Sequence, residues 1–287
     1  MTVSLLIPLV IGLTRFILSL MSNASAPAPR HIGLVNWLGL YTLTRKETER
    51  FLVVYWQTVF APVITTLLFY LVFSIALGGA AREVHGINLM AFLAPGLIMM
   101  SMAQNAFANT SSSMVISKVQ GNIVDVLMPP LSYFEFATGY ILGGIIRGLA
   151  VGIVSILCLS LIAPMHIHSL SLITFHAVMG SMLMALLGLI GGVWAAKFDH
   201  LAAVTNFIIM PATFLSGTFY TSSQLPEAWR FICHLNPFFY MIDGFRYGFT
   251  GFSDSPLLTG MLVMLACNFL LLLLCLFMLK TGYRLKT

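Results

Sequence analysis

The sequence predicts an all-α membrane protein with six transmembrane helices, an N-terminal amphipathic interfacial helix and a re-entrant outer hairpin before the last span. Of 287 residues, 59% are hydrophobic and only 8% are charged, whereas about a quarter of a soluble domain is charged. Six apolar runs are long enough to cross about 30 Å of hydrocarbon. They lack a period of two and only helices or closed barrels span lipid, so helices are predicted.

The first 30 residues are expected to form an N-terminal extension and linker. Residues 1–20 are apolar except for Arg15, and residues 24–26 (ASA) resemble a signal-peptidase site. A cleaved signal peptide is nevertheless disfavoured, because no basic residue precedes the apolar run and Arg15 interrupts it. A membrane-surface helix or a plain extension fits better, and residues 22–30 (SNASAPAPR) form the linker.

Residues 33–50 are predicted to form the amphipathic helix. Leu34, Trp37, Leu38 and Tyr41 recur at the spacing of one helical face, and the segment ends in the charged run RKETER. Such a helix lies in the headgroup plane with its apolar face toward the hydrocarbon. The alternative is a plain extension of the first span.

The predicted spans cover residues 51–77, 87–116, 136–164, 170–196, 201–220 and 256–279. Arg147 interrupts the third span about ten residues from its start, roughly 15 Å deep at the helical rise. A lone guanidinium there costs several kcal/mol, so Arg147 should face the bundle or a pathway. It would contact substrate or make structural hydrogen bonds, and its expected neighbours are Asn105, Asn109 and Ser112 of the second span.

The orientation follows from the basic residues of the loops. With a cytoplasmic N-terminus, ten Lys and Arg residues lie on the cytoplasmic side and three, Arg82, Arg230 and Arg246, on the other. Because cytoplasmic loops are enriched in Lys and Arg, both termini are predicted to be cytoplasmic. The basic residues are spread over short loops rather than gathered on one face, so nucleic acid is not an expected partner.

Two loops are unusual. In residues 118–132 (KVQGNIVDVLMPPLS), a short apolar segment follows Gly121 and stops at two prolines. A short apolar-faced helix in a cytoplasmic loop would fit a groove on a partner protein, or pack on its own bundle. Residues 216–251 are too apolar for a free loop and too broken by proline and glycine for one span. A re-entrant outer hairpin explains them.

Motifs for bond chemistry are absent from the sequence. It contains no G-x-x-x-x-G-K-[ST], H-E-x-x-H or G-x-S-x-G, so neither an enzyme nor a cofactor or metal bound by this chain is expected. All nine acids are expected in loops or at span edges, which disfavours ion coupling. Two alternatives stay open to a transport subunit driven from outside the chain. They are a membrane-embedded lipid-modifying enzyme and an ATP-independent secondary transporter.

Several stretches, in this order, resemble the ABC-2 type permease family, particularly the YadH-type inner-membrane transport permeases of Gram-negative bacteria. They are PVIT (62–65), PGLIMMS (95–101), NAFAN (105–109), the glycines and arginine of 139–148, HLNP (234–237), YMI (240–242) and GFRYG (244–248). The resemblance covers nearly everything after the linker, so residues 31–287 would be one ABC-2 type transmembrane domain.

The resemblance implies the permease subunit of an exporter in the bacterial inner membrane. An amphipathic or lipid-linked substrate is expected, because it suits the apolar lining of the spans better than a small ion does. The resemblance also implies a homodimer with two copies of a cytoplasmic ABC ATPase, which would use the ATP and Mg. The implied ATPase-coupling residues are Lys118, Gly121, Asn122, Val124, Asp125, Leu127 and Pro129. The implied outer-hairpin residues are Leu225, Pro226, Asn236, Pro237, Tyr240 and Arg246. The pathway candidates are Arg147, Asn105 and Asn109.

Overall fold

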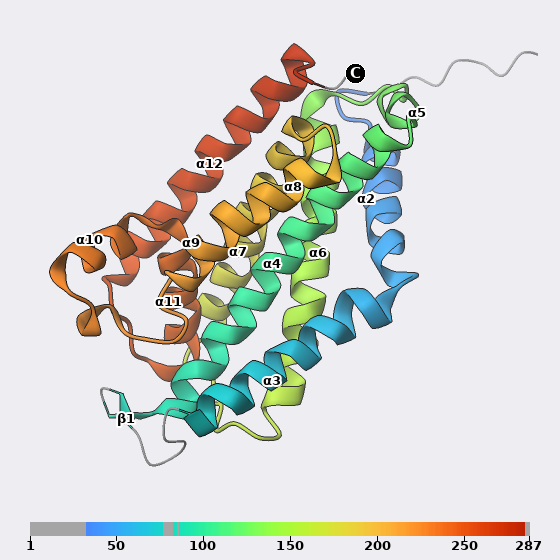
Figure 1. The fold of residues 1–287 in the computed structure, drawn as a ribbon. Coiled ribbons are helices and arrows are strands. Elements are labelled where there is room, and N and C mark those ends of the chain that lie inside the picture. The colour runs from blue at the N-terminus through green and yellow to red at the C-terminus, as the bar shows by residue number, and fades with distance from the viewer. Residues whose placement is uncertain (1–32, 77–82, 85, 285–287) are drawn as a thin grey trace, which may run out of the picture. The chain divides into compact units, whose positions relative to one another are not determined.

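A computed structural model describes residues 33–76, 83–84 and 86–284 of the chain. Within this part, five helices are long and apolar enough to cross a membrane (Figure 1). They are η1 with α3 (Trp56–Ala76), α4 (Leu89–Val119), α6 (Tyr133–Leu159), α7 (Leu170–Trp194) and α12 (Leu257–Thr281). They correspond to predicted spans one to four and six, and the expected extension at residues 1–30 lies outside the described residues.

The predicted fifth span is a shorter segment in three parts. It consists of α8 (Phe198–Val204), the π-helix η3 (Thr205–Ile209) and α9 (Met210–Phe214). The helix ends at Phe214 because the chain turns at Gly217, whose φ of +74° favours glycine. Residues 215–220, predicted as helix, therefore continue as a loop. A second π-helix, η1 (Trp56–Phe60), begins the first span.

The centre of the bundle is α4, which is buried over most of its length and packs most extensively on α7 and α6. By contrast, α3 and α12 leave most of their residues exposed. Apolar side chains such as Ile64, Leu71, Phe269 and Phe277 point outward from these two helices. An apolar outer surface around a buried central helix is the pattern expected of a helical bundle in lipid.

The helix α2 (Trp37–Leu52) is separated from the first span by a turn at residues 53–54. It packs on α6 through glycines, since Leu43 lies against Gly139 and Glu47 against Gly143. A Cβ added at Gly143 would lie 2.5 Å from Cβ of Glu47. Small residues at such positions let helices approach closely. The predicted separate helix at residues 33–50 is thus found, shifted by a few residues.

The short helix α5 (Ile123–Leu127) and the C-terminal end of α12 lie at one end of the bundle, called here the α5 end (Figure 1). The antiparallel strands β1 (Glu83–Val84) and β2 (Ile87–Asn88) lie at the opposite end. Two helices stand where the outer hairpin is predicted, α10 (Glu227–Leu235) and α11 (Pro237–Thr250), after the short 3₁₀-helix η4 (Ser222–Gln224). The second of them, α11, packs on α7, α4 and α12.

Candidate functional site

The loop that carries α5 presents an apolar tip. Side chains of Val124, Leu127 and Met128 are exposed, while Ile123 is buried beneath them. Gly121 has a φ of +74°, so the sharp turn before α5 depends on glycine. Six of the seven residues expected to contact an ATPase are exposed in this loop: Gly121, Asn122, Val124, Asp125, Leu127 and Pro129.

The seventh, Lys118, is buried and has a different role. Its Nζ donates to the carbonyl oxygens of Val193 and Ala195, the second at 3.1 Å. These carbonyls end α7, where a cation is favoured by the helix dipole. Lys118 therefore fixes the start of the α5 loop to the end of α7 rather than offering its ammonium to a partner.

The other side of the α5 loop is fixed to α2 by Glu135. Ser132 and Glu135 form a capping box at the start of α6, with Ser132 N donating to Glu135 Oε2 at 2.7 Å. The second carboxylate oxygen accepts from Asn36 N at 2.6 Å. Asn36 also donates through Nδ2 to Pro130 O at 3.1 Å. Glu135 was not among the predicted site residues, although Ser-x-x-Glu before an apolar run is a capping-box signature.

A groove of about 450 Å³ separates α2 from the α5 loop. Leu38, Thr42 and Lys46 line it from α2, and Asn122 and Asp125 from the loop. The groove combines an apolar wall with one side chain of each charge sign. Such a surface can accept a short segment of another protein.

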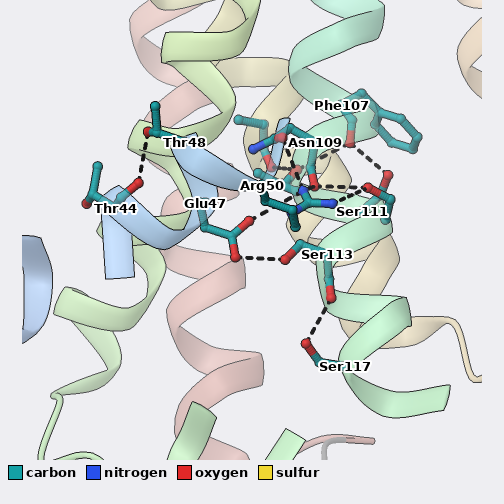
Figure 2. A network of polar contacts seen from close by, with 12 residues as sticks. Thr44, Glu47, Thr48, Arg50, Phe107, Asn109, Ser111, Ser113 and Ser117 are labelled. Carbon is teal, nitrogen blue, oxygen red and sulfur yellow. Dashed lines mark hydrogen bonds and ion pairs between the residues drawn. The ribbon is translucent and has the colours of Figure 1, made fainter. Parts of the chain in front are cut away.

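A polar cluster joins α2 to α4, as Figure 2 shows. The Glu47 side chain is fully buried, and its Oε2 lies 3.4 Å from Arg50 Nη2. Its Oε1 accepts from Ser113 Oγ at 2.8 Å. Arg50 Nη2 also donates to the carbonyl and side-chain oxygens of Asn109, at 2.6 and 3.1 Å, and Nη1 donates to Ser112 Oγ at 3.2 Å.

Arg147 has one of the three neighbours expected for it. Its Nη2 donates to Asn105 Oδ1 at 3.0 Å, whereas Asn109 and Ser112 are bonded to Arg50. The expectation was wrong for these two because Arg50 lies in a helix that folds back against α4. The expectation that the acids lie in loops or at span edges is likewise wrong for two of them. Glu47 and Asp243 are buried within α2 and α11.

Two grooves run along α4, one on each side of Gln104 and Asn105. The first, about 320 Å³, lies between α4 and the η1–α3 helix. The second, about 360 Å³, lies between α4 and the α8–η3–α9 segment. Each π-helix contributes to a groove, η1 through Gln57 and η3 through Thr205 and Ile209. π-helical segments are frequent at functional sites.

The residues expected in an outer hairpin lie just before α10, between α10 and α11, or within α11. Asn236 separates α10 from α11, accepting from Phe238 N at 3.0 Å and donating to Ala212 O at 2.6 Å. Pro237 begins α11, while Leu225 and Pro226 precede α10. Tyr240 is buried.

Arg246, expected in the outer hairpin, is buried in α11. Its Nη2 donates to Gly217 O at 2.6 Å, its Nε donates to Phe92 O at 3.3 Å, and its guanidinium lies 3.8 Å above the Phe92 ring. It therefore fastens the loop after α9 to the start of α4.

Residues 39–250 of the chain, which include most of α2, the α5 loop, the two grooves beside α4 and α11, match the ABC-2 type transporter family. The chain belongs to this family. It is also 40% identical over 238 residues to the inner membrane transport permease YadH of Escherichia coli K12, covering 82% of this chain and 93% of that protein. The YadH permease of Shigella flexneri matches to the same extent.

Membership of the ABC-2 family implies a transmembrane permease of an ABC transporter, working with an ABC ATPase subunit. The relatives are named as transport permeases of the inner membrane, which agrees with several long apolar helices in this chain. The resemblance that the motifs indicated is thus confirmed.

Proposed function

We propose that the chain is the export permease of a transporter whose energy comes from a separate ATPase. Two copies of the chain, as a homodimer, would carry two copies of the ATPase on the α5 end. The ATPase would use ATP and Mg, and this chain would bind no cofactor. The observation that carries this proposal is the exposed apolar tip of the α5 loop, held between α7 and α2 beside an open groove.

In this proposal the α5 end and both termini face the cytoplasm. The α8–η3–α9 segment crosses the membrane in addition to the five long helices, which makes six crossings. The helices α10 and α11 form a re-entrant outer hairpin. At 1.5 Å per residue the segment 198–214 would be about 25 Å long, close to the hydrocarbon thickness. Exposed Trp229, Phe231 and Leu235 on α10 suit a position at the outer headgroup level.

The pathway would run along the two grooves beside α4, lined by α3, α4 and the α8–η3–α9 segment, with the outer hairpin as a lid. Their mixed lining of amide, hydroxyl and apolar side chains suits an amphipathic or lipid-linked substrate. Movement would be mechanical, because ATP-driven closure of the partner displaces the α5 loop and no residue of this chain needs to make or break bonds.

The test is co-purification with an ATPase that carries a Walker A motif, followed by measurement of its ATP hydrolysis. We expect Leu127→Ala and Gly121→Val to abolish most of the stimulation by the permease, while both variants still insert into the membrane. Leu235→Ala, which truncates an exposed leucine of α10, is the matched control and should stimulate normally. Full stimulation by both loop variants, or the absence of any associated ATPase, would contradict the proposal.

A further inference from the structure

The polar cluster beside α4 carries an excess positive charge. Arg50 is paired with Glu47, but within the described residues Arg147 forms no ion pair and donates only to the neutral Asn105. Their partners on α4, Asn105 and Asn109, are one helical turn apart, about 6 Å along the axis. Two like charges held close together in this way destabilise one another. The cluster thus contains two cations and one carboxylate, which pairs with Arg50.

Burying two guanidinium groups with a single carboxylate costs free energy unless a ligand supplies a further negative charge. Breaking or omitting one partner of a buried ion pair leaves a charge without its solvation, and ionisable groups within membrane helices mark ligand pathways. The Nε atoms of both arginines are buried and have no hydrogen-bond partner among the described residues. Arg147 itself is only half-buried, so its guanidinium is not sealed from the surrounding space.

The groove between α3 and α4 ends next to this charge. Asn105, the acceptor of the Arg147 bond, is also part of the groove wall, together with Gln57 and Gln104. These amides are at the end of the groove nearer the α5 end, because α4 runs toward that end and Gln57 stands at the start of η1–α3. The polar end of the groove and the uncompensated arginine therefore adjoin.

The opposite end of the same groove is apolar. Phe69 and Leu97 line it, with Thr65 and Ser101 between the two ends. Because α3 and α4 run in opposite directions, the side chains of both walls become less polar toward the same end of the groove. A ligand that matches this gradient has a polar head near Asn105 and an apolar body toward Phe69.

We propose that the groove between α3 and α4 binds an amphiphile with an anionic headgroup, whose charge pairs with Arg147 and whose apolar part lies against Phe69 and Leu97. This inference rests on the proposed function, and it narrows the substrate class from amphipathic molecules in general to anionic ones. A charge-assisted hydrogen bond from a guanidinium to a phosphate or carboxylate is among the stronger polar contacts in proteins. A zwitterionic head adds no net negative charge, and a cationic head adds a positive one, so neither offsets the excess charge.

The experiment measures lipid binding to the purified full-length protein in neutral detergent by native mass spectrometry. Phosphatidylglycerol and phosphatidylcholine with identical acyl chains are the probes, and free glycerol phosphate is the competitor. We expect wild type to bind phosphatidylglycerol about tenfold more tightly than phosphatidylcholine, because the choline ammonium of phosphatidylcholine cancels the charge that its phosphate brings to Arg147. Arg147→Gln should bring the two affinities together, and Arg147→Lys should keep most of the difference.

Two further variants locate the effect. Arg45→Gln removes an exposed charge of α2 and should bind as wild type does. Thr65→Trp fills the groove from an exposed position and should weaken binding of both lipids without changing the charge. It also tests the groove if Arg147→Gln fails to fold. Glycerol phosphate should compete only at far higher concentration than the lipid, because it lacks the apolar part.

An undiminished preference in Arg147→Gln, an equal loss in Arg45→Gln, or normal binding by Thr65→Trp would overturn the inference. Competition by glycerol phosphate as strong as that of the lipid would overturn its apolar half. These outcomes are independent of ATPase co-purification, so the inference can fail while the proposed function stands.

Discussion

Glu47 is the carboxylate on which the contact between α2 and α4 depends. It compensates Arg50 and accepts from Ser113, and its side chain has no access to solvent. Removing it leaves a partly buried guanidinium without a counter-charge and Ser113 without its acceptor. The substitution would therefore destabilise the folded state and would not merely remove a contact at the surface.

We therefore expect Glu47→Ala to lower the free energy of unfolding by about 1–3 kcal/mol. A denaturing-detergent titration of the purified protein measures it. Glu49→Ala, which removes the exposed partner of Arg45 two residues away, should leave the transition where it is. Equal effects of the two substitutions would contradict the role given to Glu47.

The residues of this cluster were only partly predictable from the sequence. Arg147 and Asn105 were, because a cation within an apolar run has few possible partners nearby. Glu47 and Arg50 were not, since they belong to a charged run that is typical of a solvated helix end. Only the packing of α2 against the glycines of α6 brings them to α4.

At the scale of elements, the contact between α2 and α6 depends on two positions that lack a side chain. Gly139 and Gly143 receive Leu43 and Glu47, with no room for another carbon. A methyl group at Gly143 would displace the backbone of α2, because the nearest atom is a Cβ and not the end of a flexible chain.

We expect Gly143→Ala to destabilise the protein by about 1–3 kcal/mol and to weaken ATPase stimulation, because α2 is displaced. Gly191→Ala in α7 is the matched control, since its added Cβ would meet nothing closer than Leu201 Cδ1 at 4.0 Å. Alanine favours a helix over glycine, so this variant should be as stable as wild type or slightly more so. The thermal midpoint of each variant in detergent measures the difference, and an unchanged midpoint for Gly143→Ala would refute this packing.

The five long helices could be predicted from apolar length alone, because only a helix satisfies its own backbone in lipid. The α8–η3–α9 segment could not be bounded this way. Its apolar character continues past Phe214, but Gly217 turns the chain, and Arg246 then binds the carbonyls of Gly217 and Thr218. A long-range contact of this kind leaves no local signal.

At the scale of the whole molecule, the number of crossings determines which side each loop faces. If the 198–214 segment crosses the bilayer, position 197 is cytoplasmic and position 220 is on the outer side. We expect single cysteines placed at Lys197 and Tyr220, in a background with the four native cysteines replaced, to react with a membrane-impermeant maleimide from opposite sides. Labelling of both from the same side would contradict the crossing, because a bundle with five crossings could not place the C-terminal end of α12 at the α5 end.

The α5 loop is attached to the rest of the bundle at both of its ends. At one end Lys118 donates to the last carbonyls of α7, and at the other Glu135 accepts from the amide of Asn36, which caps α2. A force applied to the exposed tip would therefore be transmitted to two different helices. Tilting the loop would move its two attachment points in opposite directions. A small rotation of the α5 loop would thereby slide α7 and α2 in opposite directions on either side of the glycines of α6. The bundle itself would not need to bend.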